Sequence, residues 1–273
     1  MPKTTRRKGK EKRAAPTPKP KVPDDEPAAP QSAPPPVIVD DKKWTTGDFT
    51  IVSSDDVRFR VDSMALFVAS PIFREASEMT SGEKIVHLTD PDFETAVVVR
   101  TFLKFVIEFD LQPKARPFSE SLIPVDVPPP VIFLACFMHK YDCHLELRRL
   151  QYVFEKEHRY DATYSRDRFI LAALAKSISG CAGAIEDAGA KFLGVASNTN
   201  SGGNSYKDTA PLIPKNMSKA IKNTIPNEYL AALVKGWEKS GKDRSRSEWA
   251  RQFRIHLKES QTAARTALPT KSA

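Results

Sequence analysis

The alternation of apolar and polar residues around residue 50 predicts a β-hairpin. Apolar side chains occupy every second position in two short runs, Phe49 and Ile51 and then Val57, Phe59 and Val61. The residues SSDD between the runs are typical of a turn. A period of two with one apolar side indicates strands that bury one face of a sheet. We therefore expect a hairpin over residues 48–62.

After this hairpin the apolar pattern becomes helical. Asp62 or Ser63 is suited to cap a helix, because a short polar side chain accepts hydrogen bonds from the free N–H groups of the first turn. The segment MALFVA that follows is apolar throughout, so we expect a helix buried on all sides. Ser70-Pro71 predicts a second helix start, since proline lacks an N–H that the first turn leaves unpaired. Its apolar face is expected to comprise Ile72, Phe73, Ala76 and Met79.

The rest of the chain predicts one short strand and several helices. The strand is IVHLTD, residues 85–90, and Asp90-Pro91 is expected to open the next helix. That helix has apolar or small residues at steps of three and four: Phe93, Val97, Thr101, Phe102, Phe105, Val106 and Phe109. Further helices are expected at residues 131–141, 144–158 with Leu147, Leu150 and Phe154 facing inward, 166–179, 182–193, 226–239 and 247–260. Residues 110–130 contain six prolines and predict an irregular loop.

Strands that cluster early, followed by helices, are typical of an α+β fold with helices packed on a small sheet. Residues 1–43 contain 10 of the 22 prolines and few large apolar side chains, which predicts disorder. The expected organisation is a basic, Pro-rich tail at 1–43, a folded domain at 44–160, a helical extension at 161–195, a flexible linker at 196–216, a C-terminal helical segment at 217–260 and a disordered tail at 261–273.

This order of elements resembles the BTB/POZ domain, specifically fungal members with a helical C-terminal extension. The matching segments are DFTIVSSDDVRFRVDSMALFVASPIFREASE (48–78), IVHLTDPDFETAVVVRTFLKFV (85–106) and FLACFMHKYDCHLELRRL (133–150). The chain departs from the family where His-Arg or His-Lys is common and Asp62-Ser63 stands instead. The Pro-rich segment 110–130 also replaces a much shorter connection.

The resemblance implies a non-enzymatic protein-interaction module that forms a homodimer or a BTB heterodimer, or that acts as a cullin adaptor in a ubiquitin ligase. Family dimers commonly bury the first helix, which here carries Met64, Leu66, Phe67 and Val68. The surface used by cullin-binding members would correspond to His87, Thr89, Asp92, Phe93 and residues 141–144. The sequence contains no cullin-specific motif. The residues predicted for a partner interface are Met64, Leu66, Phe67, Val68, His87 and Phe93.

The net charge of +8 lies entirely in the first 22 residues, which hold nine basic residues and one acidic residue. The remaining chain is neutral, which argues against a phosphate-gripping surface on the body. The densest basic cluster comprises Arg6, Arg7, Lys8, Lys10, Lys12 and Arg13. It predicts either a nuclear localisation signal or a nucleic-acid contact, so the alternative function is a nuclear, transcription-related factor. The expected localisation is nuclear, cytoplasmic or both.

No sequence motif predicts catalysis or a cofactor. Nucleotide-binding and common hydrolase signatures are absent from the 273 residues. Cys136, His139, Cys143 and His144 are the most metal-like group, but their spacing on an apolar helix favours packing over a zinc site. Cys181 in SGCAG is expected in a tight turn with Gly180 and Gly183, without a base to activate its thiol.

The C-terminal segment at residues 236–258 places basic residues among Trp237, Trp249 and Phe253. Such a pattern is compatible with base stacking on nucleic acid, but the acidic residues among them favour aromatic packing against the domain. No apolar run is long enough to predict a membrane span. We therefore expect three reduced thiols, no cofactor, no metal and no membrane contact.

Overall fold

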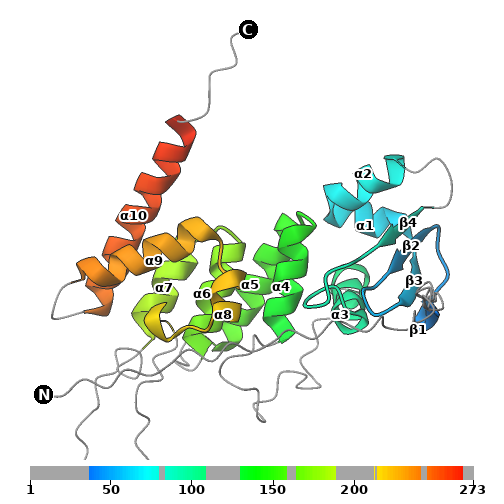
Figure 1. Cartoon of the computed structure of the whole chain (residues 1–273), viewed down its shortest axis with the longest axis horizontal. Helices are drawn as coiled ribbons and strands as arrows, with labels where there is room; N and C mark the ends of the chain where they lie inside the picture. Colours follow the sequence, from blue (N-terminus) through cyan, green and yellow to red (C-terminus); the bar gives the residue numbers. More distant parts are fainter. Residues whose placement is uncertain are drawn as a thin grey trace, which may run out of the picture. The chain divides into compact units, whose positions relative to one another are not determined.

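The computed structural model is an α+β fold, as the sequence predicts, in which a four-stranded sheet packs with helices (Figure 1). The structure describes residues 37–79, 84–108, 130–158, 164–188, 212, 214–240 and 245–266. The predicted basic cluster at Arg6–Arg13, the Pro-rich loop and almost all of the 196–216 linker lie outside the described residues.

The sheet has the strand order β1-β3-β2-β4. Its strands are β1 (Val39–Thr45), β2 (Phe49–Val52), β3 (Val57–Val61) and β4 (Ile85–His87). β2 and β3 form the predicted antiparallel hairpin, in which Phe49 lies opposite Val61 and Ile51 opposite Phe59. All four of these side chains are buried, so the period-two alternation does mark the core face. β4 runs parallel to β2, and β1 runs parallel to β3.

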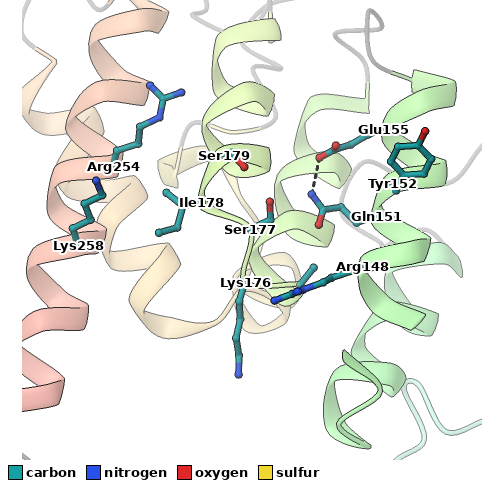
Figure 2. Close-up of a pocket in the computed structure, with 11 residues that line it drawn as sticks. Arg148, Gln151, Tyr152, Glu155, Lys176, Ser177, Ile178, Ser179, Arg254 and Lys258 are labelled. Carbon is teal, nitrogen blue, oxygen red and sulfur yellow. Dashed lines mark hydrogen bonds between the residues drawn. The ribbon is translucent and has the colours of Figure 1, made fainter. Parts of the chain in front are cut away.

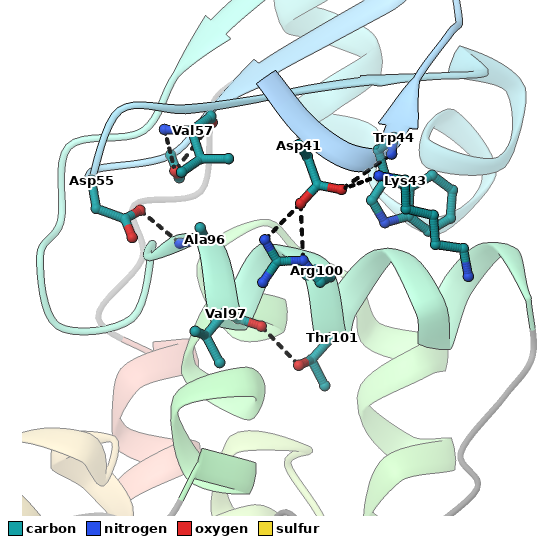
Figure 3. Close-up of polar contacts among 10 residues, drawn as sticks. Asp41, Lys43, Trp44, Asp55, Val57, Ala96, Val97, Arg100 and Thr101 are labelled. Atoms are coloured by element: carbon teal, nitrogen blue, oxygen red, sulfur yellow. Dashed lines mark hydrogen bonds and ion pairs between the residues drawn. The ribbon is translucent and has the colours of Figure 1, made fainter. Parts of the chain in front are cut away.

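Strand β1 corrects the prediction that residues 1–43 are disordered, because it begins at Val39. Its sequence, VDDKKWT, is too polar for an alternation test to identify. Asp41 supplies the missing stabilisation (Figure 3): its buried carboxylate accepts hydrogen bonds from the N–H groups of Lys43 and Trp44 and from the Arg100 guanidinium at 2.6 Å. Burial alone would raise the pKa of Asp41, but these hydrogen bonds outweigh it and hold the pKa below its usual value.

The helix pair α1 (Ser63–Ala69) and α2 (Pro71–Met79) follows the hairpin, with the break at Ser70 as predicted. The Ser70 hydroxyl accepts a hydrogen bond from the Phe73 N–H and donates one to the Tyr141 carbonyl at 2.5 Å. Phe73 is fully buried and stacks on the Tyr141 ring at a centroid distance of 4.5 Å. The Ser-Pro break therefore joins the helix pair to the end of the central helix.

Helix α3 (Ala96–Ile107) begins six residues later than the predicted start at Asp90. Its first free N–H, that of Ala96, donates to the Asp55 carboxylate at 2.7 Å (Figure 3), and Asp55 lies in the hairpin turn. The predicted apolar stripe is also partly wrong, because Val97 is exposed while Val98, Val99 and Leu103 are buried. The later start rotates the buried face, and local sequence carries no sign of a cap from a distant turn.

The central helices are α4 (Pro130–Lys140), α5 (His144–His158), α6 (Ser165–Leu174) and α7 (Ile178–Asp187). Leu147, Leu150 and Phe154 of α5 face inward, as predicted. The predicted ends of α6 and α7 are wrong, because Gly180 lies inside α7 instead of in a turn. The true turn contains Lys176 at φ 57°, and Ser177 caps α7 by accepting a hydrogen bond from the Gly180 N–H at 3.1 Å.

The C-terminal helices belong to the same compact unit as the sheet, which spans Val37–Ala273. They are η3 (Pro214–Asn216), α8 (Lys219–Thr224), α9 (Asn227–Lys239) and α10 (Arg246–Thr266). Buried Phe253 of α10 meets Phe169 of α6 edge-on at 5.6 Å. Helix α8 was not predicted, and α10 extends into the 261–273 segment predicted to be a disordered tail.

Candidate protein-interaction surface

Helix α1 leaves one side without a covering element in the described structure. Met64 is 74% exposed and Val68 is 80% exposed, whereas Leu66 and Ala69 are buried. Residues four positions apart lie on the same side of a helix, so Met64 and Val68 form one apolar stripe. The prediction that MALFVA is buried on all sides is therefore wrong. Among the predicted interface residues, Leu66 belongs to the core and is inaccessible to a partner.

Helix α2 continues this apolar surface. Ile72 is 37% exposed and Met79 is 87% exposed, and seven residues separate them, so they share a side of the helix. The predicted inward face of α2 is correct for Phe73 but wrong for Met79. We call Met64, Val68, Ile72 and Met79 the α1–α2 surface. Scattered apolar residues are common on proteins, whereas a contiguous set on neighbouring helices is typical of an interaction site.

The start of α1 is held rigidly by two aspartates. The Met64 N–H donates to Asp62 Oδ1 at 2.8 Å, so Asp62 is the N-cap. Asp48 accepts hydrogen bonds from the Ser63 N–H at 2.8 Å and the Ser63 hydroxyl at 2.7 Å. The hydrogen bonds from Ser63 lower the pKa of Asp48. Asp62-Ser63 therefore fixes the entry of α1, which is a structural use for the residues that depart from the BTB pattern.

Phe67 lies at the boundary between this surface and the core. Its ring packs edge-on against buried Phe49 at 5.6 Å, and Lys84 Nζ lies 5.8 Å from its centroid. Phe67 is half-buried, so part of the ring is accessible beside Met64 and Val68. It is the one predicted interface residue that both anchors α1 and reaches solvent.

His87 and Phe93 lie apart from the α1 set in the chain's fold, at the end of β4 and in the turn before α3. His87 is exposed, while half-buried Phe93 lies beneath Lys140, whose Nζ is 5.4 Å from the ring centroid. The structure does bring the predicted 87–93 and 141–144 segments together. Tyr141 and Cys143 are buried, however, and offer a partner almost no side-chain surface.

Glu94 joins these two segments and was not identified in the sequence. Its carboxylate is fully buried and accepts hydrogen bonds from the N–H groups of Thr89 and Asp90, both at 2.7 Å, and from the Tyr141 hydroxyl at 2.7 Å. Lys140 Nζ lies 2.5 Å away. Burial alone would raise the pKa of Glu94, but the hydrogen bonds prevail and the pKa is lowered. A single glutamate in a polar turn gives no sequence signal of such a role.

The cysteine and histidine residues do not form a metal or catalytic site within the described part of the chain. No group of three potential ligands is close enough to hold a metal there. Burial raises the pKa of Cys136 to about 12 and raises that of Cys143 and Cys181 as well. A raised pKa keeps these thiols protonated and therefore poor nucleophiles.

The C-terminal aromatics pack inside the protein, as the sequence predicts. Trp249 and Phe253 are fully buried, and the Trp249 indole N–H donates to the Leu233 carbonyl at 3.2 Å. Trp237 meets Trp249 edge-on at 4.7 Å. Buried rings cannot stack on nucleic-acid bases, so this segment is a structural helix pair.

No protein-family model, curated protein or solved structure matches this chain. Among the described residues, no helix is both long and apolar enough to cross a membrane. The functional argument therefore starts from the α1–α2 surface.

Proposed function

We propose that this chain is a non-enzymatic protein-interaction module that self-associates through the α1–α2 surface. The observation that supports this most directly is the side-by-side exposure of Met64 and Val68 on a helix whose start is fixed by two aspartates. Fully burying one such side chain contributes roughly 1.5–3 kcal/mol. A symmetric dimer would cover the same surface on both copies with one contact.

The succession of elements also supports a BTB/POZ-like body. A hairpin is followed by two helices, a strand parallel to the first hairpin strand, and further helices. In this proposal the described residues up to Asp187 form the interaction domain with its helical extension. A homodimer, or a heterodimer with another BTB protein, is the assembly proposed.

Light scattering on the full chain tests self-association, with concentration raised from about 1 to 100 µM. We expect twice the monomer mass, and conversion to monomer when Met64→Asp and Val68→Asp are combined. Leu145→Asp is the matched control, because Leu145 is 73% exposed on α5 and outside the α1–α2 surface. A wild-type chain that stays monomeric, or a control that dissociates equally, would contradict the proposal.

A second candidate function rests on the +8 charge of the first 22 residues, which accounts for the net charge of the whole chain. A neutral body with a basic tail is typical of proteins that contact nucleic acid through the tail alone. Deleting residues 1–22 should remove DNA or RNA binding and its salt dependence. Unchanged binding would exclude the tail from any such role.

A further inference from the structure

A groove lies between α5, the start of α7 and α10, and it shares no residue with the α1–α2 surface (Figure 2). It has a volume of about 660 Å³. A second hollow of about 320 Å³ adjoins it, and Arg148 and Lys176 line both. Together the two hollows form a groove long enough for an extended ligand.

The groove is positively charged in an otherwise neutral body. Arg148, Lys176 and Lys258 line it, and in the described structure none of the three forms an ion pair with a carboxylate. Arg254 is shared with Glu186 at 3.1 Å. The one acid in the lining, Glu155, accepts a hydrogen bond from Gln151 at 2.8 Å, as Figure 2 shows. Like charges gathered without counter-charges destabilise a fold unless a ligand of opposite charge relieves them.

Apolar side chains lie between these cations. Tyr152 is 66% exposed, Leu145 is 73% exposed, and Ile178 is half-buried. A ligand that fits must therefore present negative charges and apolar groups in alternation. An acidic peptide with interspersed aliphatic residues has this chemistry.

We propose that this groove binds an acidic, aliphatic peptide segment of a partner protein. Nucleic acid fits the groove less well, because duplex-binding proteins commonly make about 6–10 phosphate contacts and only three free cations are present here. Arg and Lys at the edges would take carboxylates, while Tyr152 and Ile178 would contact aliphatic side chains. The groove would give the chain a second binding surface, independent of self-association.

Fluorescence anisotropy on the full chain tests this proposal with a labelled peptide of repeating Glu-Glu-Leu. The variant Lys176→Glu/Lys258→Glu should bind on the order of tenfold more weakly, whereas Lys235→Glu should bind as wild type. Lys235 is the matched control because it is exposed on α9 and outside the groove. The milder Arg148→Gln/Lys258→Gln variant provides the same comparison should charge reversal impair folding.

Two further arms separate the alternatives. A Gln-Gln-Leu peptide should bind more weakly than the acidic one, and an oligothymidylate should not compete with it at the groove. Neutralising Arg6, Arg7 and Lys8 in the full chain removes part of the tail charge. Peptide binding that is lost with the tail variant but unchanged in the groove variants would overturn the proposal. Absence of saturable binding up to about 1 mM would overturn it too, as would an oligothymidylate that binds the groove more tightly than the peptide.

Discussion

Helices α1 and α4 have similar sequences but opposite environments. MALFVA in α1 and VIFLACFM in α4 are both apolar on all sides. In α4, Val131, Leu134 and Phe137 are buried, because α3, α5 and α6 surround the helix. In α1, Met64 and Val68 remain exposed. An apolar helix that is fully covered is core, and one that is covered on one side is a candidate interface.

The largest expected effect tests the core side of this comparison. Phe137→Ala should lower the free energy of unfolding by about 3–5 kcal/mol, because it leaves a cavity beside the rings of Phe102 and Tyr141 at 4.9 and 4.7 Å. Urea denaturation measures the change. Leu145→Ala on exposed α5 is the control and should stay within about 0.5 kcal/mol of wild type. A small effect of Phe137→Ala would show that α4 is not the packed core described here.

Glu94→Gln tests the polar connection from the α3 turn to the end of α4. An amide has one acceptor oxygen, so an N–H pair at Thr89 and Asp90 would face an NH₂ group or the Tyr141 hydroxyl would lose its acceptor. We expect a loss of about 2 kcal/mol near pH 7. Urea denaturation measures it, with exposed Glu238→Gln as the control.

The same variant has a pH dependence with a defined sign. The pKa of Glu94 in the folded protein lies below its ordinary value of 4.5. Its carboxylate therefore stabilises the fold fully above that value, and the stabilisation is lost as the pH falls below it. Wild type and Glu94→Gln should converge in stability as the pH falls from about 7 to about 3. A constant difference across that range would contradict the assignment.

Gly236→Ala tests the contact between α9 and α10. An added Cβ would lie 2.9 Å from the Phe253 backbone nitrogen, so the two helices must separate. We expect a loss of about 1–2 kcal/mol, even though alanine favours helix. The control is Gly183→Ala in α7, where a Cβ meets nothing within 4 Å and should be neutral or stabilising by up to about 1 kcal/mol. Thermal denaturation that ranks the two alanines in the reverse order would contradict this packing.

The smallest effect concerns the start of α1. Asp62→Ala removes the side chain that accepts the Met64 N–H and should lower stability by about 1 kcal/mol. Asp62→Asn keeps an acceptor and should stay within a few tenths of a kcal/mol of wild type. Chemical denaturation of the two variants measures the difference. Equal losses in both would show that charge, and not capping, is what Asp62 contributes.

Sequence patterns predicted elements well where the cause of structure is local. The hairpin alternation, the Ser70-Pro71 break and the inward face of α5 depend on neighbours within a few residues, and all three are confirmed. Predictions failed where a distant group acts. Asp55 sets the start of α3 from the hairpin turn, and Arg100 of α3 satisfies the buried Asp41 in β1.

The candidate surface shows the same division between local and tertiary causes. The sequence indicated Met64, Phe67 and Val68 but also Leu66, because periodicity alone cannot say which side of an apolar helix is covered. It gave no sign of the groove, whose cations come from α5, the turn before α7 and α10. Arg148, Lys176 and Lys258 are unremarkable along the chain and become neighbours only through helix packing.

By itself, the sequence determined the α+β class, the order of the main elements and the places where strand gives way to helix, because side-chain period and capping are local properties. Tertiary structure decided which apolar faces are covered and which charges lie together. The physical reason is that burial and electrostatic potential depend on every element packed nearby. Residues 64 and 68 are exposed, and residues 131 and 137 are core, because of what covers them.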